Sequence, residues 1–302
     1  MPTNTTVIDI RSLSYTGTTW LNLVLGTSSD AFAIGPPDRL FRLLEHGVAQ
    51  QGPPCRVCGD PCSLWDSILP RIDPEKNVYR QVSELTGCSH VVINNPAIGK
   101  ARDHLDESVD VKRIFVVRDG RGTIHSYRRY SPDKSMKEAI NWFLPAAKAL
   151  HAMTASSDSP ILRFEDLIVS PEVALQEVAS YSGLQLPDNA HLYWEHDLHP
   201  VAGNAGAIAM RKLHMGQPVS KDRPDFMARY DRLVESMGRQ ALEEEWKKTW
   251  TPEELNAFDR KAGAFNAGFN YDRDPGIPGN RPGILNRLHG ACTALLNRNE
   301  RN

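Results

Sequence analysis

Short apolar runs of strand length alternate along this 302-residue chain with longer segments in which apolar residues recur at helical spacing. Strands that are buried on both faces of a parallel sheet read as nearly continuous apolar runs, and four segments have this character. The alternation predicts an α/β protein in three layers, with a central parallel sheet flanked by helices. The predicted strands are Val7–Ile10, Val91–Ile93, Ile114–Val117 and Ile161–Phe164.

Amphipathic patterns predict helices between these strands and after them. The longest has a single apolar stripe, and Pro145 inside it should kink or split the helix. Nearer the C-terminus, Thr251-Pro-Glu-Glu combines an N-cap, a proline at the first helical position and acids in the first turn. The predicted helices are Thr18–Leu25, Asp38–His46, Lys134–Met153 and Pro171–Ser182, with two more between Pro224 and Ala267.

Composition suggests one large domain followed by a short appendage. Hydrophobic residues make up 40% of the chain and charged residues 24%, which is ordinary for a globular protein. A stretch rich in proline and glycine begins at Asp274 and leads to a short amphipathic segment, Ile284–Asn297. We therefore expect one domain over residues 1–273, with residues 274–302 forming a linker and a tail.

The net charge of −2 gives no reason to expect nucleic acid or an anionic membrane as a partner. No apolar run reaches the roughly 18 residues of a membrane-spanning helix. No leader pattern precedes the first predicted strand at Val7. We expect a cytoplasmic protein whose five cysteines stay reduced or bind a metal, and no oligomeric state is predicted.

The turn after the first predicted strand has the composition of a phosphate-binding loop. It reads Ser12-Leu-Ser-Tyr-Thr-Gly-Thr-Thr-Trp-Leu21 and leads directly into a predicted helix. At such a junction the backbone N–H groups surround a phosphate, Gly17 permits close approach, and Thr18 and Thr19 add hydroxyl donors. The nucleoside-triphosphate version of this loop has a lysine where Thr18 stands, so a kinase is disfavoured. An ordinary strand–helix turn is the alternative.

A second candidate phosphate site follows the third predicted strand. Arg118 comes directly after four apolar strand residues, and Ser126 follows eight positions later. Residues 111–130 contain six lysines and arginines and one aspartate in an otherwise nearly neutral chain. Arg118 and Ser126 can therefore bind a second phosphate through charge-assisted hydrogen bonds.

Together these motifs resemble the sulfotransferase family, which has a P-loop type α/β fold. Thr16-Gly-Thr-Thr-Trp-Leu21 resembles its 5′-phosphosulfate loop, and the spacing from Arg118 to Ser126 resembles its 3′-phosphate motif. Leu162-Arg-Phe-Glu-Asp-Leu167 and the segment His199-Pro-Val-Ala-Gly-Asn204, followed by Arg211, resemble later family signatures. The resemblance covers roughly residues 7–270 in the family's order.

This resemblance implies a sulfotransferase that moves a sulfuryl group from 3′-phosphoadenosine 5′-phosphosulfate to a hydroxyl-bearing acceptor. Two phosphate sites without a Walker lysine suit a donor that has a 3′-phosphate and no γ-phosphate. The donor-binding residues implied by the matched motifs are Thr16, Gly17, Thr18, Thr19, Trp20, Arg118, Ser126 and Arg211.

The sequence departs from the family pattern at the position of the loop cation. Family members have a lysine or arginine two residues before the loop glycine, whereas this chain has Tyr15. Arg11, at the end of the first predicted strand, and Lys100 are equal candidates to supply the missing charge, and Arg102 is a further one.

A second departure concerns the catalytic base. Many relatives have a glutamate after a glycine beyond the first helix, and here Pro36 follows Gly35 instead. Nearby groups that can accept a proton are Glu45, His46 and Asp38.

Three cysteines in a predicted loop over residues 51–62 have the spacing of a metal site. Cys55, Cys58 and Cys62, with Cys88 or His90, can form a structural zinc site of the Cys₄ or Cys₃His type. The alternative is a loop of reduced cysteines without a metal.

Two other functions stay open at this stage. One is a P-loop kinase of a small metabolite, which requires a loop lysine and an acid that binds Mg²⁺. The other is a non-catalytic protein that binds the donor, which the residues Tyr15 and Pro36 permit.

Overall fold

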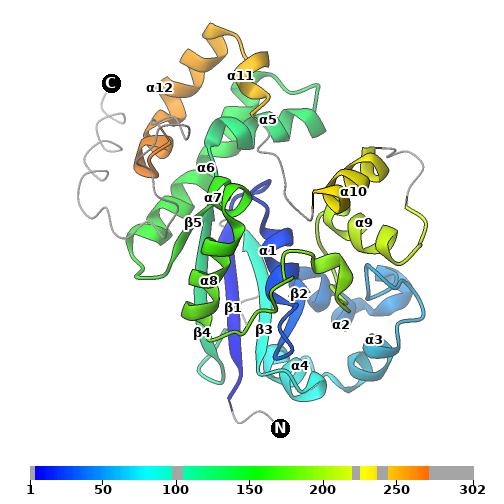
Figure 1. Ribbon diagram of the computed structural model, residues 1–302. Coiled ribbons are helices and arrows are strands. Elements are labelled where there is room, and N and C mark those ends of the chain that lie inside the picture. Colours follow the sequence, from blue (N-terminus) through cyan, green and yellow to red (C-terminus); the bar gives the residue numbers. More distant parts are fainter. Residues whose placement is uncertain (1–3, 97–104, 220–224, 237–243, 272–302) are drawn as a thin grey trace.

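A five-stranded parallel sheet forms the centre of the structure, a computed structural model that describes residues 4–96, 105–219, 225–236 and 244–271 (Figure 1). The strand order is β2-β3-β1-β4-β5, so the first strand of the chain lies in the middle of the sheet. All neighbouring strands run parallel. The strands are β1 (Thr6–Ser12), β2 (Ala31–Gly35), β3 (His90–Pro96), β4 (Asp110–Val117) and β5 (Ile161–Arg163).

The four predicted strands are confirmed, and β2 adds an edge strand that the sequence pattern does not predict. Its sequence, Ala-Phe-Ala-Ile-Gly, contains only one β-branched residue and ends in glycine, so its intrinsic preference for a strand is low. β2 forms because it pairs with β3 and buries Phe32 and Ile34. Phe164, predicted as the last residue of the fourth strand, instead begins a helix.

The four predicted helices are present, and no split occurs at Pro145, because one helix continues through that residue. The predicted cap at Thr251 is confirmed by a capping box with Glu254. The helices are α1 (Thr18–Leu25), α2 (Asp38–Gln51), α3 (Ser63–Ile68), α4 (Val78–Thr86), α5 (Gly120–Tyr130), α6 (Met136–Ala155), α7 (Phe164–Val169), α8 (Pro171–Ser182), α9 (Ala205–His214), α10 (Asp225–Glu235), α11 (Trp246–Thr249) and α12 (Pro252–Gly268).

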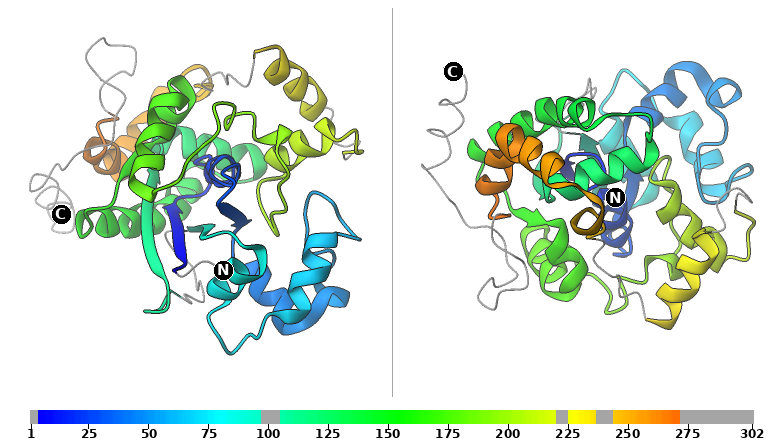
Figure 2. Two further views of the ribbon diagram at one scale, coloured as in Figure 1. Left: turned by 60° about the horizontal axis from the view of Figure 1, so that its bottom comes forward. Right: turned by 90° about the horizontal axis from the view of Figure 1, so that it is seen from above.

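Helices cover both faces of the sheet, as predicted. Ile8 and Ile10 of β1 pack in one core with α1 and α8, whereas Val7 points the other way and packs with α2, α3 and α4. On that second face, Leu13 and Phe115 belong to a further core under α6 and α12. Seen from above, α12 lies beside α5 and α6 (Figure 2, right).

The carboxyl ends of β1 and β4 meet at one edge of the sheet. Residues 13–17 connect β1 to α1, and Arg118 and Asp119 connect β4 to α5. Open α/β sheets bind ligands at this edge, outside the carboxyl ends of the strands. Both predicted phosphate motifs therefore begin at the same edge.

Within the described ranges, no helix combines the length and the apolar composition that crossing a membrane requires. The cytoplasmic location stays a prediction. The described residues end at Tyr271, so the predicted linker and tail over residues 274–302 lie outside them.

Candidate functional site

The loop between β1 and α1 has the backbone geometry that its glycine predicts. Gly17 is the N-cap of α1 with φ of +73° and ψ of 10°. A Cβ at this position would lie 2.8 Å from two atoms of the Phe164 ring, so no larger residue fits. The Thr16 hydroxyl donates to the carbonyl of Leu13 at 2.7 Å and closes the turn. The first N–H groups of α1 have no partner within the helix and follow directly on this turn, where an anion can bind them.

A cavity of about 460 Å³ opens at this edge, a volume typical of small-molecule sites. It brings together the loop residues Thr16–Trp20 and the pair Arg118 and Ser126, as the two motifs predict. Further lining residues come from α7, α9 and α10: Phe164, Leu167, Ile168, Asn204, Ala207, Met210, Arg229 and Leu233.

Arg118 is held rigidly at the cavity. Its Nη1 donates to the Tyr15 carbonyl oxygen at 2.6 Å and to the Ser126 hydroxyl at 3.2 Å. The guanidinium lies 4.4 Å from the centre of the Phe164 ring, and the residue is buried. The eight-residue spacing seen in the sequence therefore does place Arg118 and Ser126 side by side, with the positive charge at the cavity wall.

A buried polar network supports the turn that carries Arg118. Asp119 caps α5 by accepting from the Arg121 N–H at 2.8 Å. The carboxylate of Glu165 accepts from the Asp119 N–H at 3.2 Å and from the Tyr271 hydroxyl at 2.6 Å. Burial raises the pKa of Glu165. The Glu165 side chain therefore positions the Arg118–Asp119 turn and does not contribute to the cavity lining.

The segment before α9 contributes Asn204 to the cavity wall. The N–H of Asn204 donates to the Thr19 hydroxyl at 3.0 Å, and its side chain caps α9 by accepting from the Gly206 N–H at 2.9 Å. Arg211, expected to bind the donor, instead donates to the Trp194 carbonyl at 2.8 Å and pairs with Asp197 at 3.6 Å. It is not among the residues that line the cavity, so its role in donor binding stays a prediction without support from this geometry.

Two arginines that the sequence motifs do not single out line the cavity instead. They are Arg129, near the end of α5, and Arg229, on α10. A basic cluster over residues 111–130 was the only sequence signal for Arg129. Arg229 lies 111 residues beyond Arg118 in an amphipathic helix, where nothing in the local sequence marks it as a ligand.

Tyr15 stands where the sulfotransferases that the motifs resemble have a loop cation, and it has aromatic neighbours in the structure. Its ring stacks on Tyr130 with 5.6 Å between centroids and lies 6.0 Å from that of Trp142. Burial, with the nearby phenols of Tyr130 and Tyr127, raises the pKa of Tyr15. The phenol therefore keeps its proton at neutral pH and supplies neither a positive charge nor a base.

Of the proposed substitutes for this cation, the structure describes only Arg11. Arg11 is buried in an ion pair with Asp9, with Nε and Oδ2 2.7 Å apart, and does not line the cavity. On β1, Arg11 and Asp9 point to the same face of the sheet, which explains the ion pair. The role of Arg11 as the substitute cation stays a prediction that this position does not support. Lys100 and Arg102 lie outside the described residues.

The candidate bases also lie away from the cavity. Glu45 and His46 are neighbours on α2 with 3.9 Å between the carboxylate oxygen and Nε2, and both side chains are largely exposed. Neither they nor Asp38, the first residue of α2, lines the cavity. Their assignment as catalytic groups stays a prediction that the cavity lining does not support.

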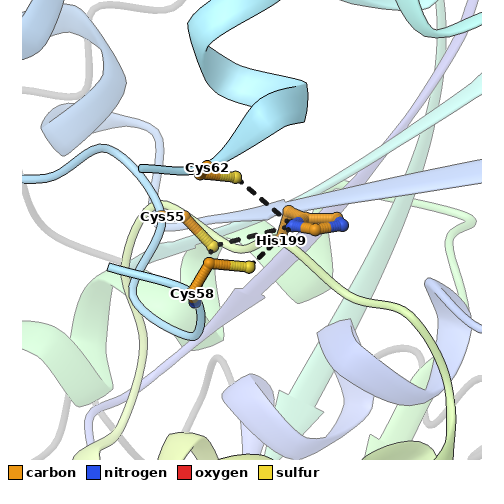
Figure 3. A group of neighbouring side chains, drawn as sticks. All are labelled: Cys55, Cys58, Cys62 and His199. Atoms are coloured by element: carbon orange, nitrogen blue, oxygen red, sulfur yellow. Dashed lines mark hydrogen bonds between the residues drawn. The ribbon is translucent and has the colours of Figure 1, made fainter. Parts of the chain in front are cut away.

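The three cysteines of the loop lie beside His199, which belongs to the His199–Asn204 segment and not to the cysteine motif. The sulfurs of Cys55, Cys58 and Cys62 converge on Nδ1 of His199 (Figure 3). Cys88, the predicted fourth ligand, instead precedes β3, and the alternative ligand His90 pairs with Asp30 at 3.2 Å. Among the described residues, the cluster consists of the three cysteines and His199 and includes neither Cys88 nor His90. The sequence does not point to His199 because it lies 137 residues from Cys62, so only the fold brings them together.

No protein family model and no curated protein matches the sequence. Two of the solved structures that share the fold are sulfotransferase domains. One is a sulfotransferase domain from the curacin biosynthetic pathway, with 15% identity, coverage of 84% of this chain and 96% of that chain, and a TM-score of 0.52. The other is a sulfotransferase domain from the Synechococcus PCC 7002 olefin synthase, with 15% identity, coverage of 91% and 97%, and a TM-score of 0.51. The chain therefore has the α/β fold of these sulfotransferase domains, as its motifs predict.

Proposed function

We propose that this chain transfers a sulfuryl group from 3′-phosphoadenosine 5′-phosphosulfate to a hydroxyl of an acceptor. The observation that carries the proposal is the cavity, in which the start of α1 and the Arg118–Ser126 pair face one space. These are two anion-binding groups at two positions. A donor with phosphate groups at both its 5′ and 3′ positions matches them, whereas a nucleotide with a single 5′ chain leaves Arg118 without a ligand.

The chain's own groups support an in-line displacement at sulfur. The N–H groups at the start of α1 and the hydroxyls of Thr18 and Thr19 hold the 5′-phosphate, which is the leaving group. Arg118 and Ser126 hold the 3′-phosphate and so fix the donor's orientation. Trp20, which also lines the cavity, offers an apolar face to the nucleoside.

Arg129 or Arg229 supplies the positive charge near the 5′-phosphate that Tyr15 cannot supply. These are the cavity-lining cations besides Arg118 among the described residues. Removing one group that stabilises the transition state typically costs about 10²–10³ in rate, so one well-placed arginine can compensate for the missing lysine.

One observation favours a second candidate function, a non-catalytic donor-binding protein. Among the described residues that line the cavity, none is an aspartate, glutamate, histidine or lysine, so no general base for the acceptor is assigned. A metabolite kinase is less well supported, since Thr18 replaces the loop lysine and the same lining offers no carboxylate for Mg²⁺.

The test is transfer of labelled sulfate. The purified full chain is incubated with ³⁵S-labelled donor and a panel of phenols, alcohols, sugars and tyrosine peptides. We expect a labelled product that depends on the protein. Donor binding without transfer to any class of acceptor would favour the non-catalytic function, and thermal stabilisation by MgATP but not by 3′-phosphoadenosine 5′-phosphate would favour a kinase.

A further inference from the structure

Three cysteine sulfurs surround one nitrogen in a way that hydrogen bonding does not explain. The sulfurs of Cys58, Cys62 and Cys55 lie 3.3, 3.5 and 3.8 Å from Nδ1 of His199. Nδ1 of a neutral imidazole carries either one proton or one lone pair, so it forms one hydrogen bond and not three. The convergence therefore indicates a common partner at the centre of the group.

The distances match a tetrahedral zinc site. Zinc bound at about 2.3 Å to sulfur and about 2.0 Å to nitrogen places each sulfur about 3.5 Å from the nitrogen. The three observed distances are centred on this value. All four ligand atoms lie within 4.8 Å of one another, and Cys55 and Cys62 are buried. Three sulfurs and one imidazole form a closed donor set of the kind found in structural zinc sites.

Neighbouring groups orient the ligands as the surroundings of metal sites commonly do. Nε2 of His199, the nitrogen that faces away from the cysteines, lies 3.3 Å from a carboxylate oxygen of Asp197. The Cys58 N–H points to the Cys55 sulfur at 3.3 Å. The Trp65 indole donates to the carbonyl of His199 at 2.8 Å and fixes the backbone there. A carboxylate behind the histidine and an N–H on a sulfur both favour metal binding.

We propose that Cys55, Cys58, Cys62 and His199 bind one zinc ion that fastens the cysteine loop to the segment before α9. Each cysteine binds as a thiolate and releases its proton to solvent. The three thiolates and Zn²⁺ together carry one negative charge, and Arg211 offsets the further negative charge of Asp197 beside His199.

The zinc site lies at one end of a segment whose other end forms the cavity wall. Beyond His199, the Arg56 N–H donates to the carbonyl of Pro200 at 2.9 Å, and the Val201 N–H donates to the carbonyl of Ile34 in β2 at 2.9 Å. The segment ends at Asn204, whose N–H donates to the Thr19 hydroxyl. Zinc therefore stabilises the position of Asn204 beside the phosphate loop. This consequence rests on the proposed function, whereas the metal site does not.

The first test is the metal content of the full chain, purified under reducing conditions without added metal or chelator. We expect close to one zinc per chain by elemental analysis. After removal of the metal, Co²⁺ should restore binding and give the sulfur-to-cobalt charge-transfer band and the intense visible bands of tetrahedral coordination. A reduced chain that holds no zinc and takes up neither Zn²⁺ nor Co²⁺ would overturn the site, as would a disulfide among the three cysteines.

Variants identify the ligands, with Cys88 as a matched control. Cys58→Ser and Cys62→Ser should lose the cobalt spectrum, whereas Cys88→Ser should keep the zinc and the spectrum of the unaltered protein. His199→Cys should retain metal as a four-thiolate site, and His199→Ala should not. If Cys88→Ser lost the metal and Cys58→Ser kept it, the ligand assignment would be wrong. If the serine variants fail to fold, the metal content of the unaltered protein still tests the proposal, because that measurement needs no variant.

The link to the cavity is tested by calorimetry with 3′-phosphoadenosine 5′-phosphate on zinc-loaded and metal-depleted chain. We expect depletion to weaken binding about tenfold, within the range usual for coupled sites. Equal affinity in the two forms would contradict the link while leaving the zinc site in place. A zinc-loaded chain that never binds this nucleotide would contradict the proposed function and not the metal site.

Discussion

Arg118 and Arg11 occupy the ends of neighbouring strands, yet their surroundings give them different roles. Arg118 contacts the Tyr15 carbonyl and the Ser126 hydroxyl at the cavity wall. Arg11 forms a buried ion pair with Asp9, which also accepts from Asn95 and Arg113. The sequence marks both arginines as strand-end cations. Only the direction of each side chain separates an arginine that lines the cavity from one that is held in an ion pair.

We expect Arg118→Ala to abolish the preference for 3′-phosphoadenosine 5′-phosphate over adenosine 5′-phosphate, which lacks the 3′-phosphate. The loss should be about 2–4 kcal/mol of binding free energy, the range for removing one partner of a desolvated charge pair. Calorimetric titration of both nucleotides measures it. Arg118→Ala protein that kept the preference would show that another group binds the 3′-phosphate.

Arg11→Met is the matched control. It should lower the free energy of unfolding by up to roughly 3–5 kcal/mol, because it leaves the fully buried Asp9 without its nearest cation. Arg113 and Asn95 still contact Asp9 and should keep the loss toward the lower part of this range. The folded fraction should retain the preference between the two nucleotides, as measured by the same titration.

At the scale of elements, the sequence predicts the strands, caps and turns that depend on residues close together in the chain. The strands β1, β3, β4 and β5, the cap at Thr251 and the turn at Gly17 follow from apolar runs, hydroxyl caps and one glycine. β2 has no such signal in its own sequence. It is stabilised instead by pairing with β3 and by burial of its side chains. His199 lies beside the cysteines, and Arg229 lines the cavity, only because of the tertiary fold. The local sequence around each residue does not predict these positions.

A contact between β2 and the segment before α9 gives an element-scale prediction. A Cβ on Gly35, where φ is +86°, would lie 2.3 Å from the carbonyl oxygen of Ala202. Gly35→Ala should therefore push this segment away from β2, weaken nucleotide binding about tenfold or more and lower the melting temperature. Thermal unfolding and titration with 3′-phosphoadenosine 5′-phosphate measure the two effects.

Gly87→Ala is the control that separates the effect of backbone strain from the effect of the contact between Gly35 and Ala202. Gly87 has a similar φ of +78°, but a Cβ there meets no atom within 4 Å. Its replacement should cost only the roughly 1–2 kcal/mol of a left-handed alanine and leave nucleotide affinity unchanged. If Gly35→Ala behaved like Gly87→Ala, the position of the segment would not matter for the cavity.

At the scale of the whole molecule, three segments that are far apart in the chain form one cavity. The loop after β1, the turn after β4 and the segment before α9 meet at the carboxyl edge of the sheet. The sequence motifs predict the first two and their common edge, and the third is the segment His199–Asn204 that resembles a later family signature. They do not predict the cavity's remaining cations, Arg129 and Arg229, because these depend on how α5 and α10 are placed.

The most direct test of this account is a calorimetric titration of the full chain with 3′-phosphoadenosine 5′-phosphate and, separately, with adenosine 5′-phosphate. We predict one site per chain and a preference for the bisphosphate on the order of 30- to 1000-fold, equivalent to about 2–4 kcal/mol. The preference arises because only the bisphosphate engages both the start of α1 and the Arg118–Ser126 pair. Equal affinity for the two nucleotides, or no binding of either, would contradict the account.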